Sequence, residues 1–166
     1  MAKGGDAGSA GPGSFVARVF DAPRELVFKA WTEPERLKHW WGPKGFTTPF
    51  CAVDLREGGV FLYCMRSPEG RDFWGRGVYR EIVVPERLVL VMSFADAEGN
   101  VVPATYYGLG PDWPLESLVT VTFEELAGAT RVAVRDEGVP PGPDGGGTQR
   151  GWAEMLGGLA EYLAKA

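Results

Sequence analysis

Cysteine, histidine and long hydrophobic runs are all scarce in this sequence, and each scarcity excludes a class of protein. Cys51 and Cys64 are the only two thiols and lack a C-x-x-C spacing, so neither a disulfide framework nor a metal cage is expected. Residues 1–14 (MAKGGDAGSAGPGS) lack the apolar stretch of a signal peptide, and no segment approaches a membrane span. We expect a cytoplasmic protein with no metal, no cofactor and no membrane partner.

The sequence also lacks an excess of positive charge. It has 17 Lys and Arg against 22 Asp and Glu, for a net charge of -5, which disfavours a phosphate-binding surface. No nucleic-acid partner is expected. A chain of 166 residues that is 45% hydrophobic can bury a sizeable core in a single domain. The glycine-rich residues 1–14 predict a flexible tail, and residues 15–166 predict one folded domain.

Two short helices are expected near the start of that domain. Residues 15–20 (FVARVF) are strand-like, and Asp21-Ala22-Pro23 can open a helix. Thr32 is a candidate N-cap for the second helix, which would run through Trp40 and Trp41 to Gly42-Pro43.

Alternating apolar residues and turn residues then predict an antiparallel meander. The strand-like segments are 47–55, 60–66, 72–84, 87–94, 116–126 and 129–137. Gly75 and Gly77 suggest a bulge or bend in one strand. Residues 95–114 form a long aromatic loop of the kind that often serves as a lid.

The C-terminal segment predicts one amphipathic helix. Residues 138–147 (GVPPGPDGGG) are predicted to be a flexible connector, and Thr148 can cap a helix that ends near Ala164. Gly157 and Gly158 weaken this helix or make room beside it. Its apolar stripe consists of Trp152, Met155, Leu156, Leu159 and Leu163.

Several ordered motifs carry a family resemblance. Phe20-Asp21-Ala22-Pro23, residues 30–35 (AWTEPE), Trp40-Trp41-Gly42-Pro43, residues 54–59 (DLREGG) and Gly151-Trp152 resemble the family named for the activator of Hsp90 ATPase homologue, within the START and Bet v 1-like superfamily. The resemblance implies an α+β helix-grip fold. In that fold, a curved antiparallel sheet of about six to seven strands wraps around a long C-terminal helix, and two short helices follow the first strand.

The resemblance also implies a cavity between the sheet and the C-terminal helix, with the loop 100–114 as a closing element. We expect it to bind a small hydrophobic molecule, lipid-like or aromatic. For the aromatic group of Trp31, Trp40, Trp41, Phe46 and Phe50, plain core is favoured over pocket wall, and Met and Trp on the helix also occur in dry interiors. The candidate cavity residues are Trp31, Trp40, Trp41, Phe46, Phe50, Trp74, Met92, Tyr106, Tyr107, Trp113, Trp152, Met155, Leu156 and Leu159.

Two other functions stay open at this point. An enzyme of the polyketide cyclase or dehydratase kind would need a proton-moving group, and none of the available groups forms a recognisable acid–base pair. A co-chaperone role is suggested by the family name alone; contact with Hsp90 is not expected, because the additional N-terminal domain of the activators is lacking here. A homodimer through an exposed sheet edge also stays open. The proton-moving candidates are His39, Tyr63, Tyr79, Glu81, Tyr106 and Tyr107, with His39 expected at a surface or helix end.

Overall fold

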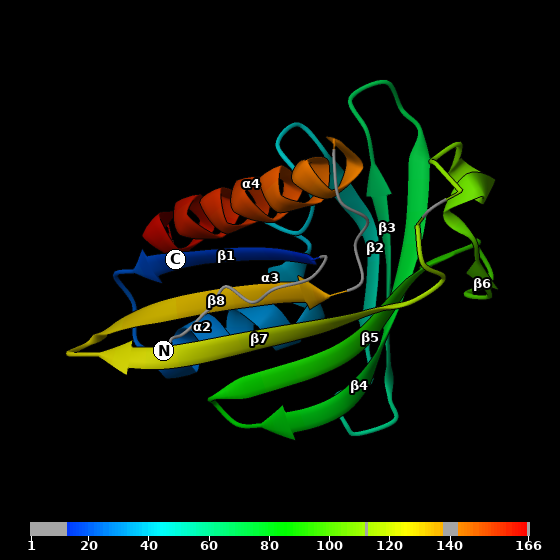
Figure 1. Ribbon diagram of the computed structural model, residues 1–166. Helices are drawn as coiled ribbons and strands as arrows, with labels where there is room; N and C mark the ends of the chain where they lie inside the picture. The colour runs from blue at the N-terminus through cyan, green and yellow to red at the C-terminus, as the bar shows by residue number, and fades with distance from the viewer. Residues whose placement is uncertain (1–12, 112, 138–142, 166) are drawn as a thin grey trace.

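One antiparallel sheet forms the frame of the molecule, for which a computed structural model describes residues 13–111, 113–137 and 143–165. Its strands lie in the order β1-β8-β7-β5-β4-β3-β2, and the short β6 pairs with β5 (Figure 1). The strands are β1 (Gly13–Phe20), β2 (Thr47–Val53), β3 (Val60–Arg66), β4 (Asp72–Val83), β5 (Arg87–Ala95), β6 (Val101–Val102), β7 (Ser117–Leu126) and β8 (Ala129–Glu137).

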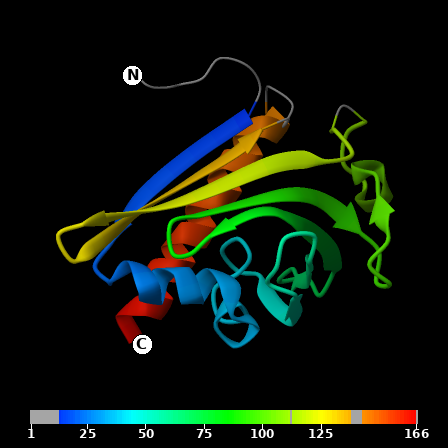
Figure 2. The same ribbon diagram turned by 90° about the horizontal axis from the view of Figure 1, so that it is seen from below.

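Helices occupy the concave side of this sheet. The C-terminal helix α4 (Pro143–Lys165) runs alongside β1, and the strands curve around it (Figures 1 and 2). Helices α2 (Arg24–Thr32) and α3 (Pro34–Leu37) lie between β1 and β2 in the chain and pack on the same side. A 3-10 helix, η1 (Ala104–Tyr107), lies with β6 at the far end of the sheet (Figure 2). The predicted sheet wrapped around a C-terminal helix is confirmed.

Strand positions follow the turn residues closely. Strands β3 and β8 have the predicted bounds, and the other predicted strands differ by one or two residues at an end, whereas the short β6 lies in the predicted loop 95–114. Alternation places every second side chain on the concave face, where apolar residues of β5, β7 and β8 are buried. The concave face therefore carries the core, together with α2 and the apolar side of α4.

The predicted cap at Thr32 is wrong. Thr32 ends α2, and its hydroxyl donates a hydrogen bond to the Phe28 carbonyl at 3.0 Å, so it cannot cap the next helix. Glu33 occupies the N-cap position of α3, but its side chain makes no capping hydrogen bond, and Pro34 begins the helix. Because α3 ends at Leu37, Trp40 and Trp41 lie in the irregular segment that follows it.

The ends of the chain's regular structure also differ from prediction. Strand β1 begins at Gly13, two residues before the expected start, and pairs with β8 from that point. Helix α4 begins at Pro143 rather than after Thr148, so part of the predicted connector is helical; residues 138–142 lie outside the described residues. Proline suits a first helical position, since its missing N–H has no partner there in any case.

The paired glycines of β4 make room for side chains instead of marking a bulge. Gly75 and Gly77 are regularly paired with both neighbouring strands, and the register shift lies between Tyr79 and Glu81. A Cβ on Gly75 would lie 2.3 Å from the Tyr63 hydroxyl oxygen, and one on Gly77 would lie 2.6 Å from the Met92 sulfur. Both glycines therefore let larger side chains lie flat on the concave face.

Two glycines of α4 lie against neighbouring parts of the chain. A Cβ on Gly158 would lie 3.4 Å from the Trp40 carbonyl oxygen, and one on Gly157 would lie 3.6 Å from the Arg18 guanidinium. Neither glycine leaves an open space under the helix. A Cβ at either position would make an ordinary van der Waals contact.

Candidate functional site

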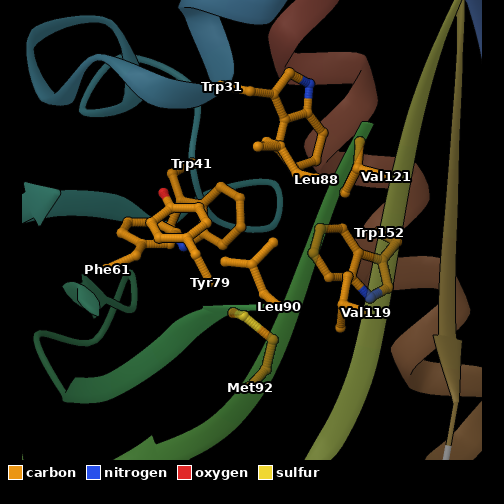
Figure 3. Close-up of a pocket in the computed structure, with 10 residues that line it drawn as sticks. All are labelled: Trp31, Trp41, Phe61, Tyr79, Leu88, Leu90, Met92, Val119, Val121 and Trp152. Atoms are coloured by element: carbon orange, nitrogen blue, oxygen red, sulfur yellow. The ribbon is translucent and has the colours of Figure 1, made fainter. Parts of the chain in front are cut away.

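A small hollow lies between the concave face and α4. Its walls come from α2, from the segment after α3, from strands β3, β4, β5 and β7, and from α4, and their side chains converge in Figure 3. The space open to the centre of a water molecule is only about 10 Å³, the smallest volume that holds one water. The lining residues are Trp31, Trp41, Phe61, Tyr79, Leu88, Leu90, Met92, Val119, Val121 and Trp152.

Three tryptophans dominate one side of the hollow. The Trp31 ring lies 5.9 Å from the Trp41 ring, edge to face, and 6.3 Å from the Trp152 ring, nearly parallel. Trp41 also meets Phe61 edge to face at 5.1 Å. These centroid distances are those of favourable aromatic pairs, so the wall is well ordered. Aliphatic residues of β5 and β7 and the flexible Met92 complete the lining.

Three buried donors of this wall have no hydrogen-bond partner. They are the indole Nε1 groups of Trp31 and Trp41 and the hydroxyl of Tyr79. All three residues are at most 4% exposed. Burial raises the pKa of the Tyr79 hydroxyl, so this group carries its proton at neutral pH. Native proteins pair the large majority of buried polar groups, so three unpaired donors around one hollow call for an explanation.

Other tryptophan N–H groups of the core are paired. The Trp40 Nε1 donates to the Ala30 carbonyl at 3.0 Å, and Trp40 does not line the hollow. The Trp152 Nε1 donates to Oδ2 of Asp136 at 3.0 Å. Both unpaired indoles, Trp31 and Trp41, line the hollow, as the paired Trp152 also does, whereas the paired Trp40 does not.

A few polar contacts hold helix α4 to α3 and to the segment that follows it. The Met155 sulfur accepts a hydrogen bond from the Gly42 amide at 3.1 Å, and the Glu154 carboxylate accepts one from the Lys44 amide at 3.1 Å. Near its end, the Tyr162 hydroxyl lies 3.3 Å from the Arg36 guanidinium.

Eight predicted cavity residues lie in the core around the hollow. Trp31, Trp41, Met92 and Trp152 line it directly. The other four are buried in the surrounding core without lining it, namely Trp40, Met155, Leu156 and Leu159.

Six predicted cavity residues lie elsewhere. Phe50 and Trp74 contact each other on the convex face, at register positions that alternate with the inward-facing Tyr63 and Gly75. Phe46 contacts Phe73.

The predicted lid is likewise misplaced. Its residues Tyr107 and Trp113 form a sheet-end cluster with Phe73 and Phe94, and Tyr106 beside it is exposed. The Tyr107 hydroxyl donates to the Ala95 carbonyl and accepts from the Trp74 amide at 3.0 Å. These two hydrogen bonds hold the loop to the end of the sheet, and none of its described residues lines the hollow.

The proton-moving candidates are scattered. His39 is exposed and stacks on Tyr162 of α4 at 5.5 Å, which is the helix-end position expected of it. Glu81 forms a two-fold ion pair with Arg87 at 2.8 Å and 3.0 Å, which lowers the pKa of Glu81. Of the tyrosines, Tyr79 lines the hollow and Tyr63 packs beside it against Trp41. The structure therefore brings no predicted acid–base pair together.

Sequence reasoning missed one buried charge, Asp136. It continues the inward-facing series Val132, Val134 and Asp136 along β8 and is 7% exposed. Burial raises the pKa of its carboxyl, and the hydrogen bond from Trp152 and the nearby Ser117 hydroxyl oppose that rise. The sequence signal that could have revealed it is its position: a charged residue stands where the alternation of β8 predicts an inward-facing apolar one.

Two further observations bound the kind of site. Within the described parts of the chain, no three His, Cys, Asp or Glu side chains gather closely enough to hold a metal ion. Over the same residues, no helix combines the length and apolar character needed to cross a bilayer.

A curved antiparallel sheet that grips a C-terminal helix is the helix-grip fold of START and Bet v 1-like domains. The chain belongs to the family described as Activator of Hsp90 ATPase homolog 1-like protein, whose model matches residues 21–164. Among curated proteins, none matches the sequence.

Solved bacterial structures share this architecture over nearly the whole chain. A protein of Nitrosomonas europaea is 27% identical with a TM-score of 0.74, covering 95% of this chain and 97% of that one. A protein of Chromobacterium violaceum is 27% identical with a TM-score of 0.72, covering 90% and 95%. The AHSA1 protein of Silicibacter pomeroyi is 24% identical with a TM-score of 0.69 and covers 92% and 97%, a likeness of fold.

Proposed function

We propose that this protein binds a small, flat, apolar molecule that carries a hydrogen-bond acceptor, in the space between the concave face and α4. The observation that carries the proposal is the set of three unpaired buried donors, Trp31 Nε1, Trp41 Nε1 and Tyr79 hydroxyl, on the walls of one hollow. A buried donor without a partner costs about 1–3 kcal/mol, which an acceptor on a ligand would recover.

The lining favours an aromatic or fused-ring ligand. Ring faces and edges of the tryptophans and Phe61 meet aliphatic side chains across the hollow, which suits a flat apolar body. Membership of a family with a ligand-binding type of fold is consistent with this use.

Binding requires the hollow to widen, because about 10 Å³ holds no more than one water. Met92 is the most adaptable wall, since its thioether chain has several rotamers and lies over the bare backbone of Gly77. Helix α4 is a second adaptable wall, held by the few polar contacts described above. The expected mode is therefore entry of the ligand with displacement of Met92 or α4.

Thermal unfolding in the presence of 2-methoxynaphthalene, with naphthalene as the matched probe without an acceptor, tests the proposal. A probe at about 100 times its dissociation constant adds about 2.7 kcal/mol of stability, a rise in Tm of several degrees. The proposal expects a larger rise with 2-methoxynaphthalene than with naphthalene. In the variant Tyr79→Phe this difference shrinks, whereas in Tyr106→Phe, which alters an exposed tyrosine outside the hollow, it stays.

Two results would overturn the proposal. If neither probe raises Tm, the hollow binds no ligand of this class. If the triple variant Trp31→Phe, Trp41→Phe and Tyr79→Phe still discriminates between the two probes, the donors do not recognise the acceptor.

A further inference from the structure

A second unsatisfied polar group lies next to the hollow, and it is an acceptor. Oδ2 of Asp136 accepts a hydrogen bond from the Trp152 indole at 3.0 Å, while Oδ1 is buried without a hydrogen-bond partner, although the Ser117 hydroxyl lies near the carboxyl group. Asp136 is 7% exposed and Trp152 is 6% exposed. An acceptor of this kind is as costly to leave unpaired as a buried donor.

Ser14 lies beside this acceptor. It stands directly opposite Asp136 in the β1–β8 register, and opposite residues of an antiparallel pair project from the same face. Its hydroxyl is buried, at 4% exposure of the residue, and has no partner either. Two polar groups, one on each of two paired strands, are therefore directed to the same side of the sheet without using each other.

The Asp136–Ser14 pair adjoins one end of the hollow. Val119 lines the hollow and is the register partner of Asp136 on β7, and Trp152 lines it and binds Asp136. Figure 3 shows the Trp152 nitrogen beside Val119, whereas Tyr79 and Trp41 lie on the other side of Leu90. In this view the unpaired donors of Trp41 and Tyr79 therefore lie across Leu90 from the indole that binds Asp136.

We propose that Asp136 accepts a hydrogen bond from a hydroxyl group of the ligand, with Ser14 beside it, so that the ligand is a flat apolar alcohol or phenol with an acceptor at its opposite end. This inference rests on the proposed function, because it assigns a second hydrogen-bonding group of the same binding site. A neutral hydroxyl fits better than an ammonium group, because the surrounding wall is apolar and a buried cation would have to shed its water.

Two naphthalenes of the same shape separate this inference from the proposed function. 6-Methoxy-2-naphthol carries an acceptor and a hydroxyl donor, and 2,6-dimethoxynaphthalene replaces that donor by a second acceptor. Titration of the wild-type protein at pH 7, followed by calorimetry, is expected to give about tenfold or tighter binding of the naphthol.

The variant Asp136→Asn tests the residue itself. Its carboxamide keeps an oxygen for the Trp152 indole and turns an NH2 donor toward the ligand, so the preference for the naphthol is expected to vanish or reverse. Glu137→Gln, which removes the exposed neighbouring carboxylate, is the control and keeps the wild-type preference.

The outcomes are distinct. If both probes bind wild type equally, or if Asp136→Asn keeps a tenfold preference for the naphthol, this inference is wrong while the proposed function stands. If neither probe binds, the proposed function fails and the inference with it. If the preference is lost in Asp136→Asn and kept in Glu137→Gln, Asp136 accepts a hydrogen bond from the hydroxyl group of the ligand.

Discussion

Two aromatic regions of the concave side differ in the hydrogen bonding of their buried polar atoms. In the sheet-end cluster, the Tyr107 hydroxyl both donates to Ala95 and accepts from Trp74. In the hollow, the Tyr79 hydroxyl is buried with no partner. Both residues sit among rings and both are buried. Burial alone therefore does not distinguish a structural residue from a candidate binding residue, whereas the presence or absence of hydrogen-bond partners does.

The two glycines of β4 differ in the side chains that they face. Gly75 faces the rigid Tyr63 ring, and Gly77 faces the flexible ends of Met92 and Leu90. We therefore expect the largest effect from Gly75→Ala, which should lower the free energy of unfolding by about 2 kcal/mol or more through overpacking. Gly77→Ala should cost less than about 1 kcal/mol, because Met92 can move. Urea unfolding of both variants measures the difference.

Gly77→Ala has a second effect on the hollow. A displaced Met92 takes up part of the space, so the variant should bind 2-methoxynaphthalene more weakly than wild type does. Equal losses of stability in the two glycine variants would mean that Met92 is packed as rigidly as the Tyr63 ring, and the comparison would fail.

The hydroxyl groups give the next largest effect. Tyr107→Phe leaves the Trp74 amide and the Ala95 carbonyl without this partner, which should lower the free energy of unfolding by about 1–2 kcal/mol. Tyr79→Phe removes a hydroxyl that has no partner, so stability should stay within about 0.5 kcal/mol of wild type or rise. Denaturation by urea at pH 7 measures both. A loss in Tyr79→Phe as large as that in Tyr107→Phe would show that the Tyr79 hydroxyl is bonded after all.

The smallest expected effect is a pH dependence from Asp136. Because burial raises the pKa of this carboxyl in the folded state, the unfolded chain releases the proton first as the pH rises above its ordinary value of 3.8. The wild-type free energy of unfolding, measured relative to Asp136→Asn, should therefore fall as the pH rises from that value through the folded-state pKa. Unfolding of both proteins between pH 3 and pH 7 measures this slope, and a difference that rises with pH would contradict the burial assigned to Asp136.

The sequence predicted the fold well because its signals are local. Turn residues such as Gly58 and Gly70, each with a positive φ, mark strand ends, and the late apolar stripe marks α4. Thr32 misled the prediction because a threonine can bond backward into its own helix as readily as forward across a cap.

The site was less accessible to sequence reasoning. Aromatic residues in the loop 95–114 predicted a lid, but the partners of Tyr107 hold that loop at the sheet end. Alternation shows which side chains point inward, as for Tyr79 and Asp136, yet it does not show whether an inward polar atom finds a partner. That property arises only when β4, β8 and α4 are brought together.

Indole NMR resonances test the central claim most directly, because each of the six tryptophans carries one N–H probe. On addition of 2-methoxynaphthalene to the ¹⁵N-labelled protein, the account predicts that the N–H signals of Trp31 and Trp41 shift strongly, since their unpaired donors meet the ether oxygen. Trp74, on the convex face, and Trp113, in the sheet-end cluster, should stay in place. Shifts confined to Trp74 and Trp113, or no shift at saturating probe, would contradict a ligand site beneath α4.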